Sequence, residues 1–461
     1  MRIPWGVQQW VMRVAVRWFY RRVEDEGLNR IPTHGPVILA ANHNNALVDA
    51  LVVGALVPRR VQLTAKATLL DHPITRFVVH AVGIVPLRRA KDEAQRSGAA
   101  AEGRNEGAFD AIVDTLRGEG MILIFPEGIS HSEPALAPLR TGCARMALQA
   151  LDRGVPEVTI VPIGLTFEAK GRPRSRVLLT VGTPIAASTV HDATDRVRAL
   201  TARVDEGLRA VTLNFPTSAA ARQVLEVSRT LSRLFGTTPP LTTADVPLGD
   251  TVRVARQVEE LRQVLPHATP NDIEQVEGFL ARLESWRRRA VQLGVSPAEV
   301  DMNTSLGRGT GFVAREGLAF LLAAPVALWG RLNHLIPLRL ALWIGRVTSR
   351  NPDEPAMHTL VGGFALVLLL YLALAVVVGR SAGWGWALVY LGSLPAAASL
   401  DFWLTDRWRA FVRRARGYLA LRRHPAEGQA LLEERDELRH EARQLESLLS
   451  SHAGAATDPT A

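Results

Sequence analysis

The sequence predicts an α/β domain, then a helical domain, then a pair of helices long enough to cross a membrane. Short apolar runs alternate with helical segments over the first 190 residues, and two long uncharged stretches follow residue 355. The short runs are the expected strands and lie near residues 37–41, 61–65, 83–87, 121–125, 158–165 and 177–181. Alternation of this kind favours a largely parallel or mixed sheet that is covered by helices.

Length and composition limit the other predictions. A chain of 461 residues has room for two or three domains. The single Cys143 excludes an intramolecular disulfide, and no Cys/His cluster has metal-ligand spacing, so we expect no metal and no other cofactor. The net charge of +9 comes almost wholly from arginine. No nucleic-acid-binding module is recognisable, so an anionic membrane surface is the expected partner of this charge, and no nucleic acid is expected.

Residues 1–24 predict an amphipathic helix at the membrane surface. Trp5, Trp10 and Trp18 are interleaved with Arg13 and Arg17. A helix with aromatic bulk and arginine at its polar edge suits the headgroup layer. The stretch lacks the cleavage site of a signal peptide, so we expect no processing. Packing on the following domain is an open alternative, and one helix can do both.

The most informative segment begins with the apolar run from Val37 to Ala41 and passes through a polar turn into an apolar helix start. This pattern places His43 at the carboxyl end of a strand, where the sites of α/β proteins lie. Asp49 follows six positions later. An imidazole can accept a proton from a hydroxyl, and a carboxylate on its other nitrogen stabilises the imidazolium. The pair is a candidate general base, although a histidine beside asparagines is more often a loop residue.

Further motifs follow in a fixed order. They are Gly83–Arg89, Met121–Ser130 followed by Leu139–Gly142, and Val161–Gly164. With His43 and Asp49, these blocks resemble the motifs of the phospholipid/glycerol acyltransferases, the PlsC-like family, over about residues 30–190. The commonest first motif of that family has four residues between His and Asp, whereas this chain has five. In this respect the chain resembles the branch that includes the fungal-type glycerol-3-phosphate acyltransferases.

The resemblance implies catalytic roles for two residues. His43 would remove a proton from a glycerol hydroxyl, which then attacks the thioester carbonyl of an acyl donor. Asp49 would orient His43 and stabilise its charge, as the carboxylate of a catalytic triad does. No acyl-enzyme is needed, because the hydroxyl of the acceptor is itself the nucleophile.

The resemblance also implies substrate-binding residues. Arg89 matches the phosphate-binding arginine of the family, and Glu127 and Gly128 match its acceptor-binding block. The other candidates are Lys66, Arg140, Gly142 and Pro162, of which Pro162 would line the acyl site. Each has a structural alternative, because Gly128 can be a turn former, Glu127 a helix-start residue and Arg89 part of a charged turn.

The acyltransferase domain is expected over residues 25–189, and residues 190–310 predict a helical accessory domain. Apolar residues at three- and four-residue spacing mark helices at 195–213, 218–235, 248–265 and 271–293. The many charged residues of this region are most simply solvated helix faces, and no chemistry is expected there.

Residues 311–405 predict a membrane region. The stretches 359–379 and 381–400 are uncharged and long enough to cross a bilayer, so they predict a tight transmembrane hairpin with Trp384 near an interface. Arginines flank both outer ends, which predicts that these ends and the acyltransferase domain lie in the cytoplasm. Residues 317–330 and 335–344 are apolar but shorter, so a re-entrant or interfacial position is expected. A pair of buried core helices is the alternative to the hairpin.

Residues 406–461 predict a basic segment, a short helix and a disordered tail. Leu431, Leu438 and Leu445 are seven residues apart, which fits a short coiled coil or an amphipathic helix that packs on its own domain. Weak self-association through this helix and packing within the chain are both open. Residues 450–461 are expected to be disordered.

Three functions remain open at this point. The first is transfer of an acyl chain from acyl-CoA or acyl carrier protein to glycerol 3-phosphate or to its 1-acyl form. The second uses another lysophospholipid as acceptor, and the third is an inactive lipid-binding membrane module. The presence of His43, Asp49 and Glu127 argues against the third. The five-residue spacer favours glycerol 3-phosphate, but the commoner activity of bacterial relatives favours 1-acylglycerol 3-phosphate, which is the prediction made here.

Overall fold

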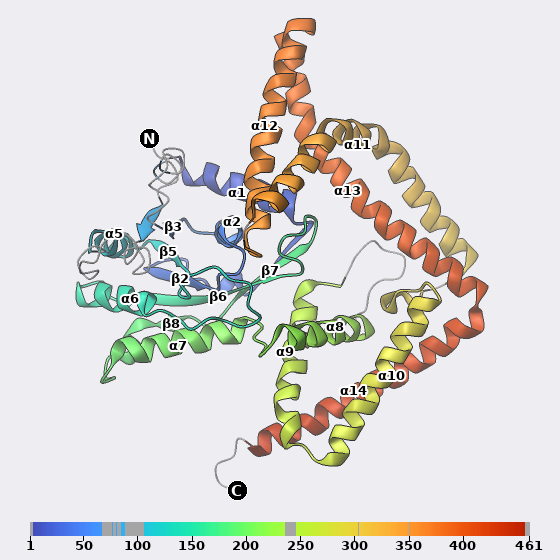
Figure 1. Cartoon of the computed structure of the whole chain (residues 1–461), viewed down its shortest axis with the longest axis horizontal. Coiled ribbons are helices and arrows are strands. Elements are labelled where there is room, and N and C mark those ends of the chain that lie inside the picture. The colour runs from blue at the N-terminus through green and yellow to red at the C-terminus, as the bar shows by residue number, and fades with distance from the viewer. Residues whose placement is uncertain are drawn as a thin grey trace. The chain divides into compact units, whose positions relative to one another are not determined.

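A computed structural model describes residues 3–66, 76, 80, 84–87, 106–235, 246–302, 304–349 and 351–456. The chain divides into two compact units (Figure 1). The first unit comprises Met1–Ser218 and Ala341–Phe364, and the second comprises Ala219–Leu340 and Ala365–Ala461.

The first unit is built on a mixed sheet of eight strands within the described residues, in the order β1-β7-β6-β2-β5-β3-β4, with β8 paired to β6. The pairs of β6 with β7 and β8 are antiparallel, and the other pairs are parallel. This confirms the mixed sheet that the sequence predicts. The strands are β1 Arg22–Glu26, β2 Val37–Ala41, β3 Val61–Lys66, β4 Val85–Leu87, β5 Met121–Ile124, β6 Thr159–Phe167, β7 Arg176–Val181 and β8 Ile185–Ala186.

Helices cover both faces of this sheet, and β2 shows why its sequence is apolar throughout. Val37, Leu39 and Ala41 pack in a core with α1 (Trp5–Phe19) and α2 (Leu47–Leu56). Ile38 and Ala40 point to the other face, where they pack with α5 (Glu106–Arg117), α6 (Gly142–Asp152) and α7 (Arg196–Val211). A strand that is buried on both faces needs a continuous apolar run.

The first unit extends beyond the expected boundary at residue 189. Leu200, Val204 and Leu208 lie on one side of α7 and are buried in the same core as Ile38 of β2. The helix is therefore part of the α/β domain, and the helical unit begins near Ser218. Helical periodicity alone could not assign α7 to either domain.

Helix α1 packs on α2 with one face and exposes apolar side chains on the other. Met12, Val16 and Phe19 are buried, whereas Val7 and Trp10 are exposed. The two helices approach so closely that a Cβ on Gly54 would overlap the sulfur of Met12. One helix therefore both completes the core and presents an apolar face outward, as the sequence analysis allowed.

The second unit contains a helical core that covers the leucines of the C-terminal helix. Its helices include α8 Ser218–Phe235, α9 Leu248–Val264, α10 Pro270–Gln292 and α14 Pro425–Ala456, with η5 Pro297–Glu299 after α10. Leu431, Leu438 and Leu445 pack with Phe279 and Trp286 of α10. The indole Nε1 of Trp286 also donates to the carbonyl of Leu431 at 2.9 Å. Packing within the chain thus buries this leucine stripe without a second copy.

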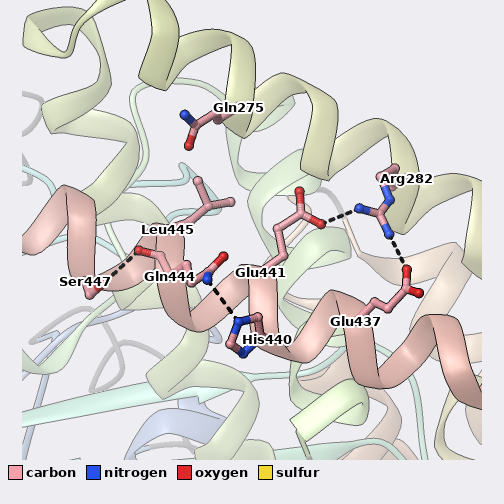
Figure 2. Close-up of a pocket in the computed structure, with 8 residues that line it drawn as sticks. All are labelled: Gln275, Arg282, Glu437, His440, Glu441, Gln444, Leu445 and Ser447. Atoms are coloured by element: carbon pink, nitrogen blue, oxygen red, sulfur yellow. Dashed lines mark hydrogen bonds and ion pairs between the residues drawn. The ribbon is translucent and has the colours of Figure 1, made fainter.

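A polar hollow of about 730 Å³ lies between α10 and α14 (Figure 2). Arg282 of α10 spans it and donates to Glu437 and Glu441 of α14, each at 2.9 Å. Its charged side chains are thus paired across the two helices. Helix α14 continues to Ala456, into the segment for which the sequence analysis expects disorder. Residues 457–461 lie outside the described part of the chain.

Three long apolar helices complete the chain: α11 Leu306–Thr348, α12 Pro355–Ala382 and α13 Trp384–Arg423. Each is long and apolar enough to cross a membrane by length and composition. The two stretches of the expected hairpin fall in α12 and α13, and a tight turn at Gly383 joins them. Residues 317–330 and 335–344, which the sequence analysis treated as separate short segments, instead belong to one continuous helix with Pro325 and Pro337 inside it.

Polar contacts hold α11 beside its neighbours. Glu316 of α11 is fully buried and accepts from Arg407 of α13, and the indole of Trp329 donates to Ser393 at 3.2 Å. His334 is also buried, with its Nδ1 2.7 Å from the carbonyl of Gly330 and its Nε2 2.7 Å from the hydroxyl of Tyr371 in α12.

Candidate active site

The site is built at the carboxyl end of β2, where the chain turns before α2. The side-chain amide of Asn42 binds the backbone of Leu165 in β6 at both ends, since Nδ2 donates to the carbonyl at 3.1 Å and Oδ1 accepts from the N–H at 2.7 Å. This pair of hydrogen bonds fixes the end of β2 against β6, which continues to Phe167. The residue after Asn42 is His43.

His43 and Asp49 are in direct contact. Oδ2 of the fully buried Asp49 lies 2.9 Å from Nδ1 of His43 and accepts the backbone N–H groups of Asn44 at 2.9 Å and Asn45 at 2.8 Å. The five-residue spacer thus wraps around the carboxylate, and Ala46 takes up the turn with a positive φ of 48°. Burial raises the pKa of Asp49, and the hydrogen bond and charge of His43 oppose that shift.

The ring of His43 has one nitrogen available. It stacks on Phe125 at 4.1 Å between centroids with 16° between planes. Because Oδ2 of Asp49 already accepts two backbone N–H groups, it also acts as the acceptor toward His43, so the proton sits on Nδ1 and Nε2 carries the lone pair. Nε2 forms no hydrogen bond with any described residue, and the side chain is 13% exposed. This is the arrangement of a base that can take a proton from a bound hydroxyl.

Glu127 holds the backbone of His43. Its Oε1 accepts the N–H of His43 at 2.6 Å, and its Oε2 accepts the N–H of Ala137 at 2.8 Å and contacts Nε2 of His131. The N–H of His131 in turn donates to the carbonyl of His43 at 3.1 Å. The carboxylate is buried and engaged by these donors, so in this structure it positions His43.

His131 is a site residue that the sequence analysis missed. The N–H of Glu133 donates to its Nδ1 at 3.2 Å, so the proton of the neutral ring lies on Nε2 and points to Glu127. The available signal was a histidine four residues after the glutamate of the motif. Periodicity cannot reveal it, because the segment is an irregular loop.

Apolar side chains lie beside this polar cluster. The N–H of Ala46 donates to the hydroxyl of Ser130 at 3.1 Å, which brings the loops before α2 and after β5 together. The next residues outward, Leu47 and Ile129, are both exposed. The two loops that meet here therefore carry exposed apolar side chains.

The remaining predicted residues take different places. Gly128 has a φ of 73°, and a Cβ there would lie 3.3 Å from Cγ of Arg140, so these two residues are neighbours. Arg140 is exposed and forms no ion pair with a described residue. Gly142 begins α6, and a Cβ there would meet open space.

The structure says less about the predicted roles of Pro162, Lys66 and Arg89. The ring of Pro162 packs against Gly182 and against Gly207 of α7, on the sheet face that α6 and α7 cover, and its role at the acyl site stays a prediction. Lys66 ends β3 opposite Leu87 of β4. Arg88 and Arg89 lie outside the described residues.

Tyr20 connects the turn that carries His43 with the loop at Lys170. Its buried hydroxyl accepts from Nδ2 of Asn45 at 3.0 Å and donates to the carbonyl of Lys170 at 3.3 Å. Burial raises the pKa of this phenol, so it remains a neutral donor. Burial likewise raises the pKa of the Cys143 thiol to about 12, which fits the small buried residue expected there rather than a nucleophile.

Comparison with known proteins matches this part of the chain. Residues 22–166 fit a family model described as Acyltransferase. The Saccharomyces cerevisiae protein named glycerol-3-phosphate O-acyltransferase 2 is 34% identical over 119 residues, which cover 24% of this chain and 16% of that protein. The Bos taurus protein named 1-acyl-sn-glycerol-3-phosphate acyltransferase alpha is 27% identical over 201 residues, which cover 41% of this chain and 64% of that protein.

Among solved structures, the 1-acyl-sn-glycerophosphate acyltransferase PlsC of Thermotoga maritima matches with 20% identity and a TM-score of 0.33, over 46% of this chain and 82% of that one. The chain spans less than half the length of the fungal relatives it matches. The matched residues include His43, Asp49, Glu127 and the strands that position them. Residues 22–166 therefore match the acyltransferase family model, and this match covers less than half of the chain.

Proposed function

We propose that this protein is a membrane-bound acyltransferase that moves a fatty acyl chain from acyl-CoA or acyl carrier protein to the hydroxyl of 1-acyl-sn-glycerol 3-phosphate. The observation that carries the proposal is the His43 ring, with Nδ1 on a buried carboxylate and Nε2 available at the carboxyl edge of the sheet. The match of residues 22–166 to the acyltransferase model supports it.

The proposed reaction needs one base and no covalent enzyme intermediate. Nε2 of His43 takes the proton of the acceptor hydroxyl, whose oxygen attacks the thioester carbonyl carbon. Asp49 stabilises the imidazolium that forms, through the 2.9 Å contact with Nδ1. When the tetrahedral intermediate collapses, the carbon–sulfur bond breaks and the proton passes from His43 to the departing thiolate.

The surroundings of His43 suit the other parts of the two substrates. Exposed Leu47 and Ile129 offer an apolar surface for an acyl chain. Arg140, next to Gly128, is a cation available for an anionic group, and Arg89 keeps its proposed role as a phosphate ligand. Glu127 supports the reaction by holding the backbone of His43, and Lys66, Gly142 and Pro162 remain proposed substrate contacts.

Membrane attachment is proposed through the hairpin of α12 and α13, with the acyltransferase domain on the cytoplasmic side. Between residues 3 and 305, no described helix is long and apolar enough to cross a membrane. Residues 341–364 are part of the same compact unit as His43. Both ends of α11 therefore belong on one side of the membrane, which supports a re-entrant or interfacial position for α11 although its length would allow it to cross.

A second acceptor, glycerol 3-phosphate, is favoured by one specific observation. The relative with 34% identity carries this acceptor in its name, and the five-residue spacer between His43 and Asp49 resembles that branch. The two acceptors differ only in the acyl chain at one hydroxyl, so the same base serves both.

The deciding experiment compares membranes that contain wild type or His43→Ala. Each is given labelled acyl-CoA, with glycerol 3-phosphate and 1-acylglycerol 3-phosphate offered in parallel. We expect wild type to acylate 1-acylglycerol 3-phosphate and His43→Ala to acylate neither acceptor. Acylation of glycerol 3-phosphate alone would replace the acceptor, and activity that survives in His43→Ala would overturn the mechanism.

A further inference from the structure

Lys170 lies at the same edge of the sheet as His43. Strands β2 and β6 are parallel, with Ala41 at the end of β2 opposite Ile163. Strand β6 continues beyond this pair to Phe167, and Lys170 lies in the loop that follows it. The hydroxyl of Tyr20 joins the two loops, since it contacts Nδ2 of Asn45 and the carbonyl of Lys170. The loop around Lys170 is therefore attached to the turn that carries the candidate base.

The backbone around Lys170 is held on both sides. The N–H of Arg172 donates to the carbonyl of Ala169 at 3.2 Å, and the hydroxyl of Ser175 donates to the same carbonyl at 2.9 Å. With the contact from Tyr20, these bonds fix where the lysine side chain starts. A fixed starting point reduces the entropy that a binding side chain loses.

The ammonium group of Lys170 is half-buried and forms no ion pair with a described residue. Asp49, Asp353 and Glu127 act on it electrostatically, so it lies in the field of the site. Asp49 and Glu127 already accept from backbone N–H groups and from histidines. A lysine that served only to balance these charges would be expected to contact one of them.

We propose that Lys170 binds the phosphate group of the acceptor, and this inference rests on the function proposed above. An ammonium is a compact charge with three donors, which suits a phosphate that must be held beside a reacting hydroxyl. The phosphate would supply the anionic contact that the ammonium does not make with the protein. Burial lowers the pKa of Lys170, and the nearby carboxylates, as a bound phosphate would, favour its charged form.

The test uses the full chain with three substitutions. Lys170→Gln removes the charge, Lys170→Arg keeps it, and Arg172→Gln is the matched control because it removes an exposed cation from the same loop. Initial rates are measured with the acceptor varied at saturating acyl-CoA, and then with acyl-CoA varied at saturating acceptor. Thermal unfolding without substrate checks that each variant folds.

We expect Lys170→Gln to raise the KM for the acceptor about tenfold to a hundredfold, since a charge-assisted hydrogen bond contributes that much to affinity. Lys170→Arg should recover part of the loss, and Arg172→Gln should equal wild type. An unchanged acceptor KM in Lys170→Gln would overturn the inference. A change in the KM for acyl-CoA alone would also overturn it, because the phosphates of CoA would then be the ligand.

A binding measurement separates this inference from the proposed reaction. Glycerol 3-phosphate, added without acyl donor, should raise the unfolding temperature of wild type and Arg172→Gln but not that of Lys170→Gln. If wild type acylates neither acceptor yet shows this pattern, the proposed reaction fails and the phosphate site at Lys170 stands. If all variants respond equally, or none responds, the phosphate site at Lys170 is overturned.

Discussion

The first and second units each contain a histidine with polar partners, and the two histidines differ at one ring nitrogen. In the first unit, Nδ1 of His43 contacts Asp49, and Nε2 has no hydrogen bond with a described residue. In the second unit, Nδ1 of His334 contacts a carbonyl and Nε2 contacts the hydroxyl of Tyr371. The side chain of His43 is partly exposed, whereas His334 is buried.

This difference distinguishes a histidine that can act as a base from one that holds helices together. A histidine with both nitrogens engaged joins helices, as His334 joins α11 to α12, and has no lone pair to offer a substrate. His131 belongs to the same kind, because Glu127 and the N–H of Glu133 occupy its ring. Of these three histidines, only His43 combines a buried carboxylate with a nitrogen that is available.

The largest expected effect comes from replacing each of the two histidines, His43 and His334, by alanine. His43→Ala should lower kcat/KM by about 10²–10⁴-fold because the general base is lost, with little change in unfolding temperature. His334→Ala should leave turnover within a few-fold but destabilise the second unit by about 1–3 kcal/mol, because the hydroxyl of Tyr371 loses its partner. Rates and thermal unfolding of both variants test this, and a large loss of turnover in His334→Ala would remove the distinction.

The second prediction concerns Asp49. Asp49→Asn keeps the shape of the side chain but no longer stabilises the imidazolium, so we expect turnover to fall by up to about 10⁴-fold. Because burial raises the pKa of Asp49 above its usual 3.8, folding favours the protonated carboxyl. Its contribution to stability is then present below the usual pKa and is lost as the pH rises through the raised value.

The unfolding temperature of Asp49→Asn relative to wild type should therefore increase between pH 4 and pH 7, which thermal unfolding at matched ionic strength can measure. The difference between the two proteins cancels the titration of the other carboxyls. A difference that stays constant over this range would show that the hydrogen bonds from His43 and the backbone offset the effect of burial on the pKa.

The third prediction sharpens the structural side of the comparison. Leu438→Ala removes a fully buried side chain from the core between α10 and α14 and should cost about 2–5 kcal/mol of stability. Arg282→Ala, which removes exposed ion pairs across the same two helices, should cost less than about 1 kcal/mol. Denaturant unfolding measures both losses, and equal losses would contradict the dominance of apolar packing here.

The smallest expected effect tests the role of Glu127. If this carboxylate positions His43, Glu127→Gln should lower kcat by about tenfold to a hundredfold and leave the acceptor KM within about twofold. A rise in acceptor KM at constant kcat would instead identify Glu127 as a ligand of the glycerol hydroxyl. Steady-state rates with varied acceptor distinguish the two roles.

Local patterns predicted the sheet and the central pair of the site. Strands such as β2 and β5 are recognisable because parallel strands buried on both faces need unbroken apolar runs. His43 and Asp49 are close in sequence, so a turn and the first helical turn suffice to join them. These predictions depend on few residues and on no distant contact.

The remaining contacts depend on the folded chain. Tyr20 and Lys170 are 150 residues apart, and only the fold, in which β6 lies parallel to β2, brings them to the His43 loop. The contacts of Glu127 with the backbone N–H groups of His43 and Ala137 could not be predicted from the sequence either. They depend on the conformation of the loops that carry these residues. The continuous α11 was missed because residues 317–330 and 335–344 were treated as two short apolar segments, whereas one helix contains both and contacts α12 and α13.

The hydroxyl of Tyr20 has a practical consequence for anyone who trims this chain. Residues before β1 could be taken for a dispensable leader, because α1 precedes the sheet and exposes Trp10. Deleting them would remove Met12, Val16 and Phe19 from the core and, with Tyr20, the hydroxyl that steadies Asn45 beside Asp49. A soluble catalytic fragment should therefore keep α1 and replace its outward apolar side chains.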